Sequence, residues 1–285
     1  MKRFSNYIRR ICLYALCRHA AGWRGMWRLK LGQRALAYRF PKAGTLVTHT
    51  RWGVPIEVRK NDSIGHLVYF FGNYERKLLA AIRRELQPGD AALDIGANIG
   101  VVSLFCATRV GPTGRVFAIE ALRQNHELLT NNIQRAGFSN VITTEHCALG
   151  EEERTIVIRF DERTENWGNT SLLDQTGSSQ QEVPMRRLDQ VWEKWGRPRI
   201  KLVKLDVEGL EHEVLKGAER FLKECPPAVW IVEFNLDYLA REANGAANLW
   251  DIFIRRGYTP YHMKTRQRLD NPPVTHCDVL FRLEK

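Results

Sequence analysis

The sequence lacks long hydrophobic runs and paired cysteines. Near the N-terminus the longest apolar run covers residues 11–17, far short of the roughly 20 residues that a membrane-spanning helix needs. It is also a poor secretory signal, because Arg18 follows it and no clear A-x-A cleavage site does. The six cysteines include no C-x-x-C pair, so we expect free thiols in a reducing compartment and assign no metal ligand. These absences favour a cytoplasmic protein.

Acidic residues are absent from residues 1–42, which hold eleven Lys and Arg. The chain has 43 basic and 32 acidic residues, so the net charge of +11 resides in this segment and the remainder is balanced. Apolar and aromatic side chains recur there at helical spacing. We expect a basic amphipathic extension over residues 1–50, ahead of a domain over 51–285. The extension can lie on an anionic membrane surface or pack as an ordinary helix, and both alternatives stay open.

Beyond the extension, strand and helix patterns alternate. Strands are predicted over 91–95, 116–119, 141–144, 202–205 and 229–232, and helices over 74–86, 99–109, 122–136, 212–222 and 236–256. This order is typical of an α/β fold with a doubly wound, mostly parallel sheet. Residues 258–263 and 279–283 predict an antiparallel pair at one edge. We also expect short strands over 45–48 and 54–58, a loop over 175–181, and core packing for His276 and Cys277.

A glycine turn follows the first strand of this alternation. Asp94 ends the strand, Gly96 and Gly100 flank Asn98, and an apolar helical pattern begins directly afterwards. Glycine lets a backbone approach a ligand closely, and a helix start offers unpaired N–H groups. Glu120 ends the second strand, where an acidic residue can bind a ribose diol. The pattern indicates a nucleoside-containing cofactor, with a purely structural turn as the alternative.

The residues of the turn favour one cofactor class over another. A dinucleotide site prefers G-x-G-x-x-G facing a pyrophosphate, whereas here Asp94 precedes the turn and Asn98 lies inside it. A carboxylate repels a pyrophosphate but attracts an ammonium or a sulfonium. Both cations occur in S-adenosylmethionine. We therefore predict S-adenosylmethionine as the cofactor.

A second set of polar residues follows the later strands. Asp206 and Glu208 come directly after the strand over 202–205, and Glu233 follows the strand over 229–232. Ligands of open parallel sheets bind outside the carboxyl ends of the strands, so these acids should share an edge with Asp94. Paired carboxylates can act as a general base, hold a hydroxyl or bind a cation. His212 lies one helical turn beyond Glu208 and is a fourth catalytic candidate, while a helix cap for Asp206 and a solvated role for His212 remain alternatives.

Several motifs together resemble the FkbM family of S-adenosylmethionine-dependent methyltransferases, of the class I Rossmann-like group. They lie over roughly residues 64–235 and include GNYE (72–75), PGD (88–90), LDIGANIG (93–100), FAIE (117–120), CALG (147–150), RLD (187–189), KLDVEGLE (204–211) and VLKGA (214–218). The resemblance implies a seven-stranded sheet with one antiparallel strand, and O-methylation of sugar or polyketide hydroxyls. It implies cofactor contacts from Glu75, Asp94, Gly96, Asn98, Glu120 and the region of Ala148. One departure is Ala121, where the family commonly has proline.

The sequence therefore predicts an O-methyltransferase acting on a small molecule, a glycan or a lipid-linked acceptor. The basic extension would hold it peripherally on the inner face of a membrane. Two alternative functions are less well supported by the sequence. A nucleic-acid methyltransferase is disfavoured because the Asn-Pro-Pro-Val run at 271–274 lacks the aromatic residue and lies far from the fourth strand. A non-catalytic, membrane-associated protein of the same fold is disfavoured by the intact acidic residues.

Overall fold

The computed structural model describes residues 44–60, 62–160, 179–241 and 244–284. The chain divides into two compact units: residues 1–74 with 163–168, and the remainder. The basic extension predicted over residues 1–50 lies almost entirely outside the described residues, and the predicted boundary at residue 50 stays a prediction.

In the described part of the first unit, a hairpin is followed by a helix. Strands β1 (Thr45–His49) and β2 (Pro55–Arg59) pair antiparallel, close to the two predicted short strands. Helix α3 (Ser63–Phe71) was not predicted. It begins where the Asp62 carboxylate accepts the Ile64 N–H at 2.8 Å, and it ends at Gly72, whose φ of 66° favours glycine.

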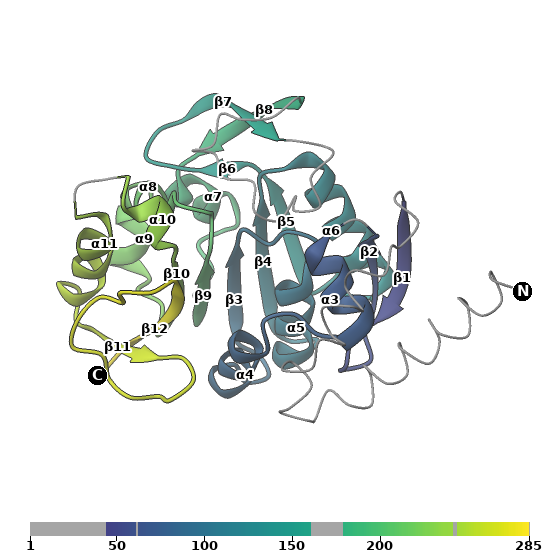
Figure 1. Ribbon diagram of the computed structural model, residues 1–285, viewed down its shortest axis with the longest axis horizontal. Helices are drawn as coiled ribbons and strands as arrows, with labels where there is room; N and C mark the ends of the chain where they lie inside the picture. The colour runs from purple at the N-terminus through teal and green to yellow at the C-terminus, as the bar shows by residue number, and fades with distance from the viewer. Residues whose placement is uncertain (1–43, 61, 161–178, 242–243, 285) are drawn as a thin grey trace, which may run out of the picture. The chain divides into compact units, whose positions relative to one another are not determined.

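The second unit is built on a seven-stranded sheet in the order β11-β12-β10-β9-β3-β4-β5 (Figure 1). Only β12 runs antiparallel to its neighbours, so the predicted α/β fold with one antiparallel strand is confirmed. The strands are β3 (Ala91–Ile95), β4 (Arg115–Glu120), β5 (Ile142–His146), β9 (Leu202–Leu205), β10 (Val229–Phe234), β11 (Tyr258–His262) and β12 (Cys277–Leu283).

Helices connect these strands, and two of the predicted helices are each divided. The helices are α4 (Arg76–Glu85), α5 (Val101–Val110), α6 (Arg123–Arg135), α7 (Leu188–Lys194), α8 (Glu211–Lys216), α9 (Glu219–Glu224), α10 (Leu236–Leu239) and α11 (Gly245–Ile254). The helix predicted over 212–222 breaks at Gly217, where a Cβ would lie 2.0 Å from the carbonyl oxygen of Gly150. The helix predicted over 236–256 is interrupted before Asn244, which adopts a left-handed φ of 60°.

A three-stranded sheet also belongs to the second unit and was not predicted. It contains β6 (Ala148–Leu149), β7 (Arg154–Phe160) and β8 (Ser179–Arg186), in the order β6-β8-β7. The loop predicted over 175–181 is wrong from Ser179 onward, because β8 alternates buried and exposed side chains and pairs with β7 throughout. Polar composition alone concealed this strand.

Aromatic side chains pack against the large sheet at β10 and β12. The rings of Trp230 and Phe253 lie 5.5 Å apart, and Phe253 stacks on Phe281 at 4.3 Å. Trp230 and Phe281 face each other across β10 and β12, and all three are fully buried. Since strand side chains alternate between faces, Glu233 lies on the face opposite Trp230 and Phe234.

The structure also tests the predictions made for the turn residues, the cysteines and His276. Asn271 and Pro272 lie in the connection between β11 and β12, as expected of turn residues. The described cysteines, Cys106, Cys147, Cys225 and Cys277, are free thiols. His276 was expected in the core, which is wrong, because its side chain is 55% exposed. Among the described residues, no helix combines the length and apolar character that crossing a membrane requires.

Candidate active site

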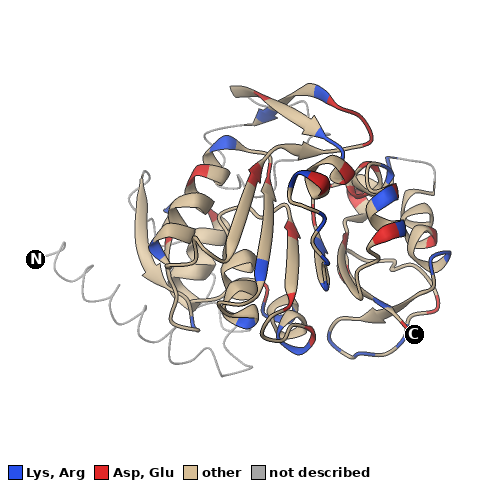
Figure 2. Ribbon diagram, turned by 180° about the vertical axis from the view of Figure 1, so that it is seen from behind, with Lys and Arg blue, Asp and Glu red and all other residues tan. Residues whose placement is uncertain are grey.

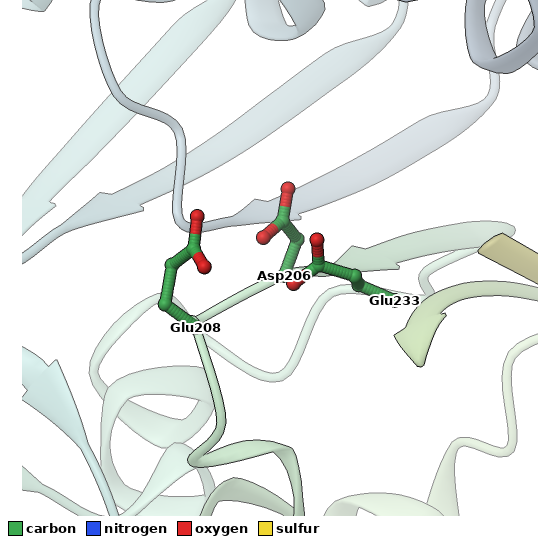
Figure 3. A group of neighbouring side chains, drawn as sticks. All are labelled: Asp206, Glu208 and Glu233. Atoms are coloured by element: carbon green, nitrogen blue, oxygen red, sulfur yellow. The ribbon is translucent and has the colours of Figure 1, made fainter. Parts of the chain in front are cut away.

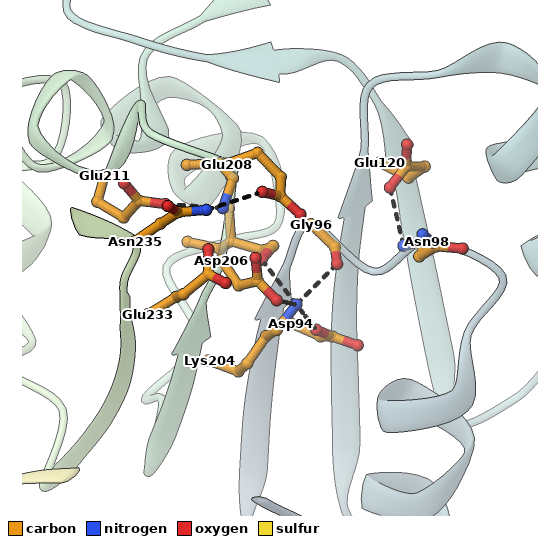
Figure 4. A network of polar contacts seen from close by, with 12 residues as sticks. Asp94, Gly96, Asn98, Glu120, Lys204, Asp206, Glu208, Glu211, Glu233 and Asn235 are labelled. Atoms are coloured by element: carbon orange, nitrogen blue, oxygen red, sulfur yellow. Dashed lines mark hydrogen bonds and ion pairs between the residues drawn. The ribbon is translucent and has the colours of Figure 1, made fainter. Parts of the chain in front are cut away.

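The glycine turn between β3 and α5 is held by the end of the neighbouring strand β4. The N–H groups of Gly96 and Ala97 donate to the Ile119 carbonyl at 3.0 and 2.9 Å. The N–H of Asn98 donates to Glu120 Oε2 at 2.8 Å, with Asn98 in the left-handed region at φ 51°. The turn is therefore shaped by hydrogen bonds before any ligand is considered (Figure 4).

The glycines of this turn serve internal packing. A Cβ at Gly96 would lie 1.8 Å from the carbonyl oxygen of Asp206, and a Cβ at Gly100 would lie 2.6 Å from Leu129 Cδ1. The close approach of a ligand to these glycines stays a prediction. In the structure, Gly96 lets the turn pack against the backbone that carries Asp206, so the two predicted sets of residues adjoin each other.

Glu120 is a buried carboxylate with several donors around it. Its Oε1 accepts from the Leu122 N–H at 2.9 Å and the Asn125 side chain at 3.4 Å, while Oε2 accepts from Asn98. Burial raises the pKa of Glu120, and these hydrogen bonds act against that rise. A carboxylate offers about four acceptor positions. Glu120 therefore keeps room for one further donor, such as a ribose hydroxyl.

Lys204 occupies the centre of the site. On β9 it stands beside Asp94 of β3, and its Nζ lies 2.8 Å from the Gly96 carbonyl, 3.1 Å from Asp206 Oδ2 and 3.7 Å from Asp94 Oδ1. Burial alone would lower the pKa of Lys204, but Asp206, Asp94 and Glu75 raise it above its ordinary value. The lysine is thus a buried ammonium that links the glycine turn to Asp206.

Asp94 is paired within the chain. Its carboxylate is 1% exposed and accepts the Ser103 hydroxyl at 2.5 Å through Oδ2, while Oδ1 has no hydrogen bond from the described residues. Burial raises its pKa, and Lys204 acts against that rise. The cation facing Asp94 in this structure is therefore Lys204. Oδ1 remains an orphaned buried acceptor beside the turn.

Asp206, Glu208 and Glu233 converge at the carboxyl ends of β9 and β10. They offer carboxylate oxygens that all lie within 4.8 Å of one another (Figure 3). Figure 2 shows acidic residues at the ends of neighbouring strands of this sheet. The separation also suits a divalent cation, but the Lys204 ammonium already supplies positive charge 3.1 Å from Asp206, so we assign no metal ligand. We call these three residues the carboxylate cluster.

Burial raises the pKa of Glu208 and Glu233 in the carboxylate cluster, and the neighbouring acidic groups add to that rise. Burial, followed by the charges of Asp206 and Glu211, raises the pKa of Glu208 to about 7. Burial likewise raises the pKa of Glu211 to about 7. The pKa of Glu233 is raised above its usual range by burial and by Asp206, Glu208 and Glu211. Crowded carboxyl groups of this kind are typical of sites that transfer protons.

The remaining predicted site residues lie at different distances from this centre. Glu75 begins α4 with a left-handed φ of 48° and contributes to the field at Lys204. Ala148 lies on β6 in the three-stranded sheet and is 3% exposed. His212 lies on α8, half-buried, and is not among the three residues of the carboxylate cluster. Its catalytic role stays a prediction.

Sequence reasoning missed four polar residues of the site. Lys204 was only part of a motif, although a lysine inside a buried strand is a signal in itself. Asn235 donates to Glu208 Oε2 at 3.4 Å, and the His276 Nε2 lies 2.8 Å from Glu233 Oε1. Asp278 pairs with Glu233 across β10 and β12, and burial together with Asp206 raises its pKa to about 6. Only the antiparallel register brings His276 and Asp278 to this edge.

This arrangement defines a class of protein: an α/β fold with a ligand site at the carboxyl edge of its parallel sheet. Comparison with known proteins gives the family. Residues 94–260 match the model of the methyltransferase FkbM domain. The match spans more than half of the chain, which therefore belongs to the FkbM methyltransferase domain family.

Relatives and solved structures add particular likenesses. The chain is 29% identical over 154 residues to the hexuronic acid methyltransferase AglP of Haloferax volcanii, covering 52% of this chain and 58% of AglP. It is 29% identical over 167 residues to the AMB antimetabolite synthetase AmbE of Pseudomonas aeruginosa, covering 47% of this chain and 8% of AmbE. It thus spans less than two thirds of both curated relatives. A crystal structure of methyltransferase FkbM from Methylobacillus flagellatus is similar with a TM-score of 0.46 and 20% identity, covering 68% of this chain and 43% of that one.

Proposed function

We propose that this protein transfers a methyl group from S-adenosylmethionine to a hydroxyl of a saccharide, a glycolipid or a similar metabolite. One observation carries the proposal: Lys204 joins the glycine turn and the carboxylate cluster at a single sheet edge, through contacts of 2.8 Å to Gly96 and 3.1 Å to Asp206. A methyl donor at the turn and an acceptor at the cluster would therefore be neighbours. Proximity of this kind is the main requirement of a displacement reaction.

The residues of the turn fit the cofactor. Glu120 has one acceptor position left for a ribose hydroxyl, and Asp94 Oδ1 is a buried acceptor without a hydrogen bond from the described residues. Gly96, Asn98 and Gly100 shape the turn between them, and Glu75 and Ala148 complete the proposed set. When bound, S-adenosylmethionine supplies an activated methyl group on a sulfonium.

The acceptor side is proposed to hold a hydroxyl. Asp206, Glu208 and Glu233 are hydrogen-bond acceptors, and those that keep a proton are also donors, so together they can orient an O–H group. Similarity to AglP, a hexuronic acid methyltransferase, supports a sugar acceptor. The chemistry and the relative therefore point to the same acceptor class.

Calorimetric titration tests the cofactor half of this proposal. S-adenosylmethionine and S-adenosylhomocysteine would be titrated into the intact protein and into Glu120→Ala. We expect binding by the intact protein that Glu120→Ala weakens strongly, because the substitution removes both the ribose acceptor and the partner of the Asn98 N–H. Absence of binding by the intact, folded protein would refute the proposal.

The location of the protein is a separate proposal that rests on charge alone. The eleven basic residues of 1–42 would attract the segment to an anionic cytoplasmic leaflet, where a lipid-linked acceptor resides. Sedimentation with liposomes containing anionic lipid, with and without residues 1–42, checks this. Equal sedimentation of both forms would remove the membrane from the account without affecting the proposed reaction.

A further inference from the structure

The carboxylate cluster is connected to the surface by one histidine. His276 immediately precedes β12, whose first residue Cys277 stands opposite Phe234 at the end of β10. This places His276 at the same sheet edge as the cluster. Its Nε2 lies 2.8 Å from Glu233 Oε1, and its side chain is 55% exposed whereas that of Glu233 is 11% exposed. Glu233 therefore lies in the carboxylate cluster, whereas His276 lies at the surface, where an acceptor can reach it.

The two oxygens of Glu233 have different surroundings. Oε1 faces His276, whereas Oε2 is buried and receives no hydrogen bond from any described residue when the cluster is ionised. Carboxylate oxygens of Asp206 and Glu208 lie within 4.8 Å of a carboxylate oxygen of Glu233. A proton on Glu233 Oε2 that is donated to Asp206 removes the repulsion between two negative charges. It also gives the buried Oε2 a hydrogen-bond partner. Glu233 Oε1 is then left to accept the His276 Nε2–H.

We propose that His276 is the general base of the methyl transfer, with Glu233 as the positioning residue that holds its Nε2–H and leaves Nδ1 to take the proton of the acceptor hydroxyl. A carboxyl group fixing one ring nitrogen while the other acts is a common use of histidine. The inference rests on the proposed function, and it assigns the base within the proposed site.

The step balances in protons and electrons. The acceptor O–H bond breaks and its proton passes to His276 Nδ1, while the electron pair of the oxygen forms the new bond to the methyl carbon. The S–CH₃ pair stays on sulfur, which becomes a neutral thioether. The resulting imidazolium interacts electrostatically with the carboxylate of Asp278, which stabilises it. Protonation of Asp206 would instead break its 3.1 Å ion pair with Lys204.

Nitrogen-15 NMR of the histidine side chains tests the pair of His276 and Glu233, which we call the dyad, without any cofactor or acceptor. In the neutral imidazole of His276 we expect the Nε2–H tautomer to be populated beyond the intrinsic preference of a free histidine for it, and we expect Glu233→Ala to return it to that intrinsic preference. His262 of β11, whose Nδ1 contacts the Thr265 hydroxyl at 2.8 Å, is the internal reference that should not respond. A proton on Nδ1 of His276 in the intact protein would overturn the proposal.

Methyl transfer supplies the second readout, with methyl α-D-glucopyranoside and methyl α-D-glucuronide as acceptors. We expect His276→Ala to lower kcat by about 100-fold, in the range of general-base removal, with the affinity for S-adenosylhomocysteine unchanged. Added imidazole should restore part of the activity because the position is exposed. His262→Gln is the matched control and should behave as the intact protein does.

The outcomes separate this inference from the proposed function. Failure of the intact protein to bind S-adenosylhomocysteine would contradict the proposed function, and the NMR experiment would still decide the dyad. Full activity of His276→Ala, or a loss that imidazole cannot restore, would refute the assignment of the base while leaving the methyltransferase proposal intact. If neither sugar is methylated, the tautomer of His276 decides the inference.

Discussion

Glu120 and Glu233 end two strands of the same sheet, yet their surroundings differ in kind. Glu120 on β4 accepts two backbone N–H groups and one side-chain amide. Glu233 on β10 faces one histidine and a group of other carboxyl groups. Burial raises the pKa of both carboxyl groups. Backbone donors act against that rise at Glu120 and suit it to binding, whereas neighbouring acids add to the rise at Glu233 and suit it to holding a proton.

Lys204 stands between these two regions, and its loss should have the largest effect. Lys204→Met leaves the buried Asp94 and the half-buried Asp206 without their cation. We expect the free energy of unfolding to fall by roughly 3–5 kcal/mol, the usual cost of removing one partner from a buried pair. Urea denaturation measures the change, with the exposed Lys223→Met as control. A loss no larger than that of the control would show that the central ammonium is not needed.

Removing the Glu120 carboxylate, which accepts hydrogen bonds from backbone N–H groups, should have the next largest effect. Glu120→Ala deprives the Asn98 and Leu122 N–H groups of their partner and removes the proposed ribose contact. We expect S-adenosylhomocysteine to bind at least about tenfold more weakly, since hydrogen bonds to charged groups contribute roughly 1.5–3 kcal/mol. Calorimetry measures this loss. The exposed Glu127→Ala on α6 should bind as tightly as the intact protein, and equal affinity of both variants would contradict the role of Glu120.

The carboxylate cluster should make the free energy of unfolding depend on pH. Glu208 has a pKa raised from 4.5 to about 7, so its protonated form is favoured in the folded state. Its contribution to stability is therefore present at low pH and is lost as the pH rises from about 4.5 to about 7. Glu208→Gln should flatten this part of the curve of unfolding free energy against pH. An unchanged curve, compared with the exposed Glu182→Gln on β8, would mean that Glu208 is ionised throughout.

An ion pair with an exposed lysine gives the smallest expected effect and calibrates the others. Lys194 Nζ lies 2.7 Å from Glu145 Oε2; the lysine side chain is 55% exposed, against 7% for Lys204, whereas Glu145 is buried. We expect Lys194→Met to cost less than about 1 kcal/mol, because an exposed lysine contributes little and Arg186 stays 3.7 Å from Glu145. The same urea denaturation applies. A loss as large as that of Lys204→Met would contradict the view that burial, rather than pairing itself, sets the cost.

Much of this organisation was accessible from the sequence because it is local. The periodicity of β3 and β9 and the turn residues between 94 and 100 depend on neighbours in the chain, and the acids at the strand ends follow from parallel order. The family motifs also lie in these local segments. The large sheet and the three residues of the carboxylate cluster were predicted for that reason.

The rest depended on contacts between distant segments. His276 pairs with Glu233 only because β12 returns antiparallel beside β10, a register that no local pattern encodes. Gly96 faces the Asp206 carbonyl across 110 residues of sequence, so its packing role could not be told from a ligand-binding one. The polar strand β8 was concealed because its partner, rather than its composition, makes it a strand.

The central claim is methyl transfer to a hydroxyl, and one labelling experiment tests it most directly. The protein would be incubated with S-adenosylmethionine carrying a ¹³C-methyl group, with the two methyl glycosides, and with a nucleic acid and an amine as competing acceptors. The products would be followed by NMR, and the Asp206→Asn variant would be treated in the same way. The account predicts a ¹³C-methyl ether on a sugar oxygen, formed together with S-adenosylhomocysteine and strongly reduced in the variant. Label on a nitrogen of an added nucleic acid or amine, with none on the sugars, would contradict it.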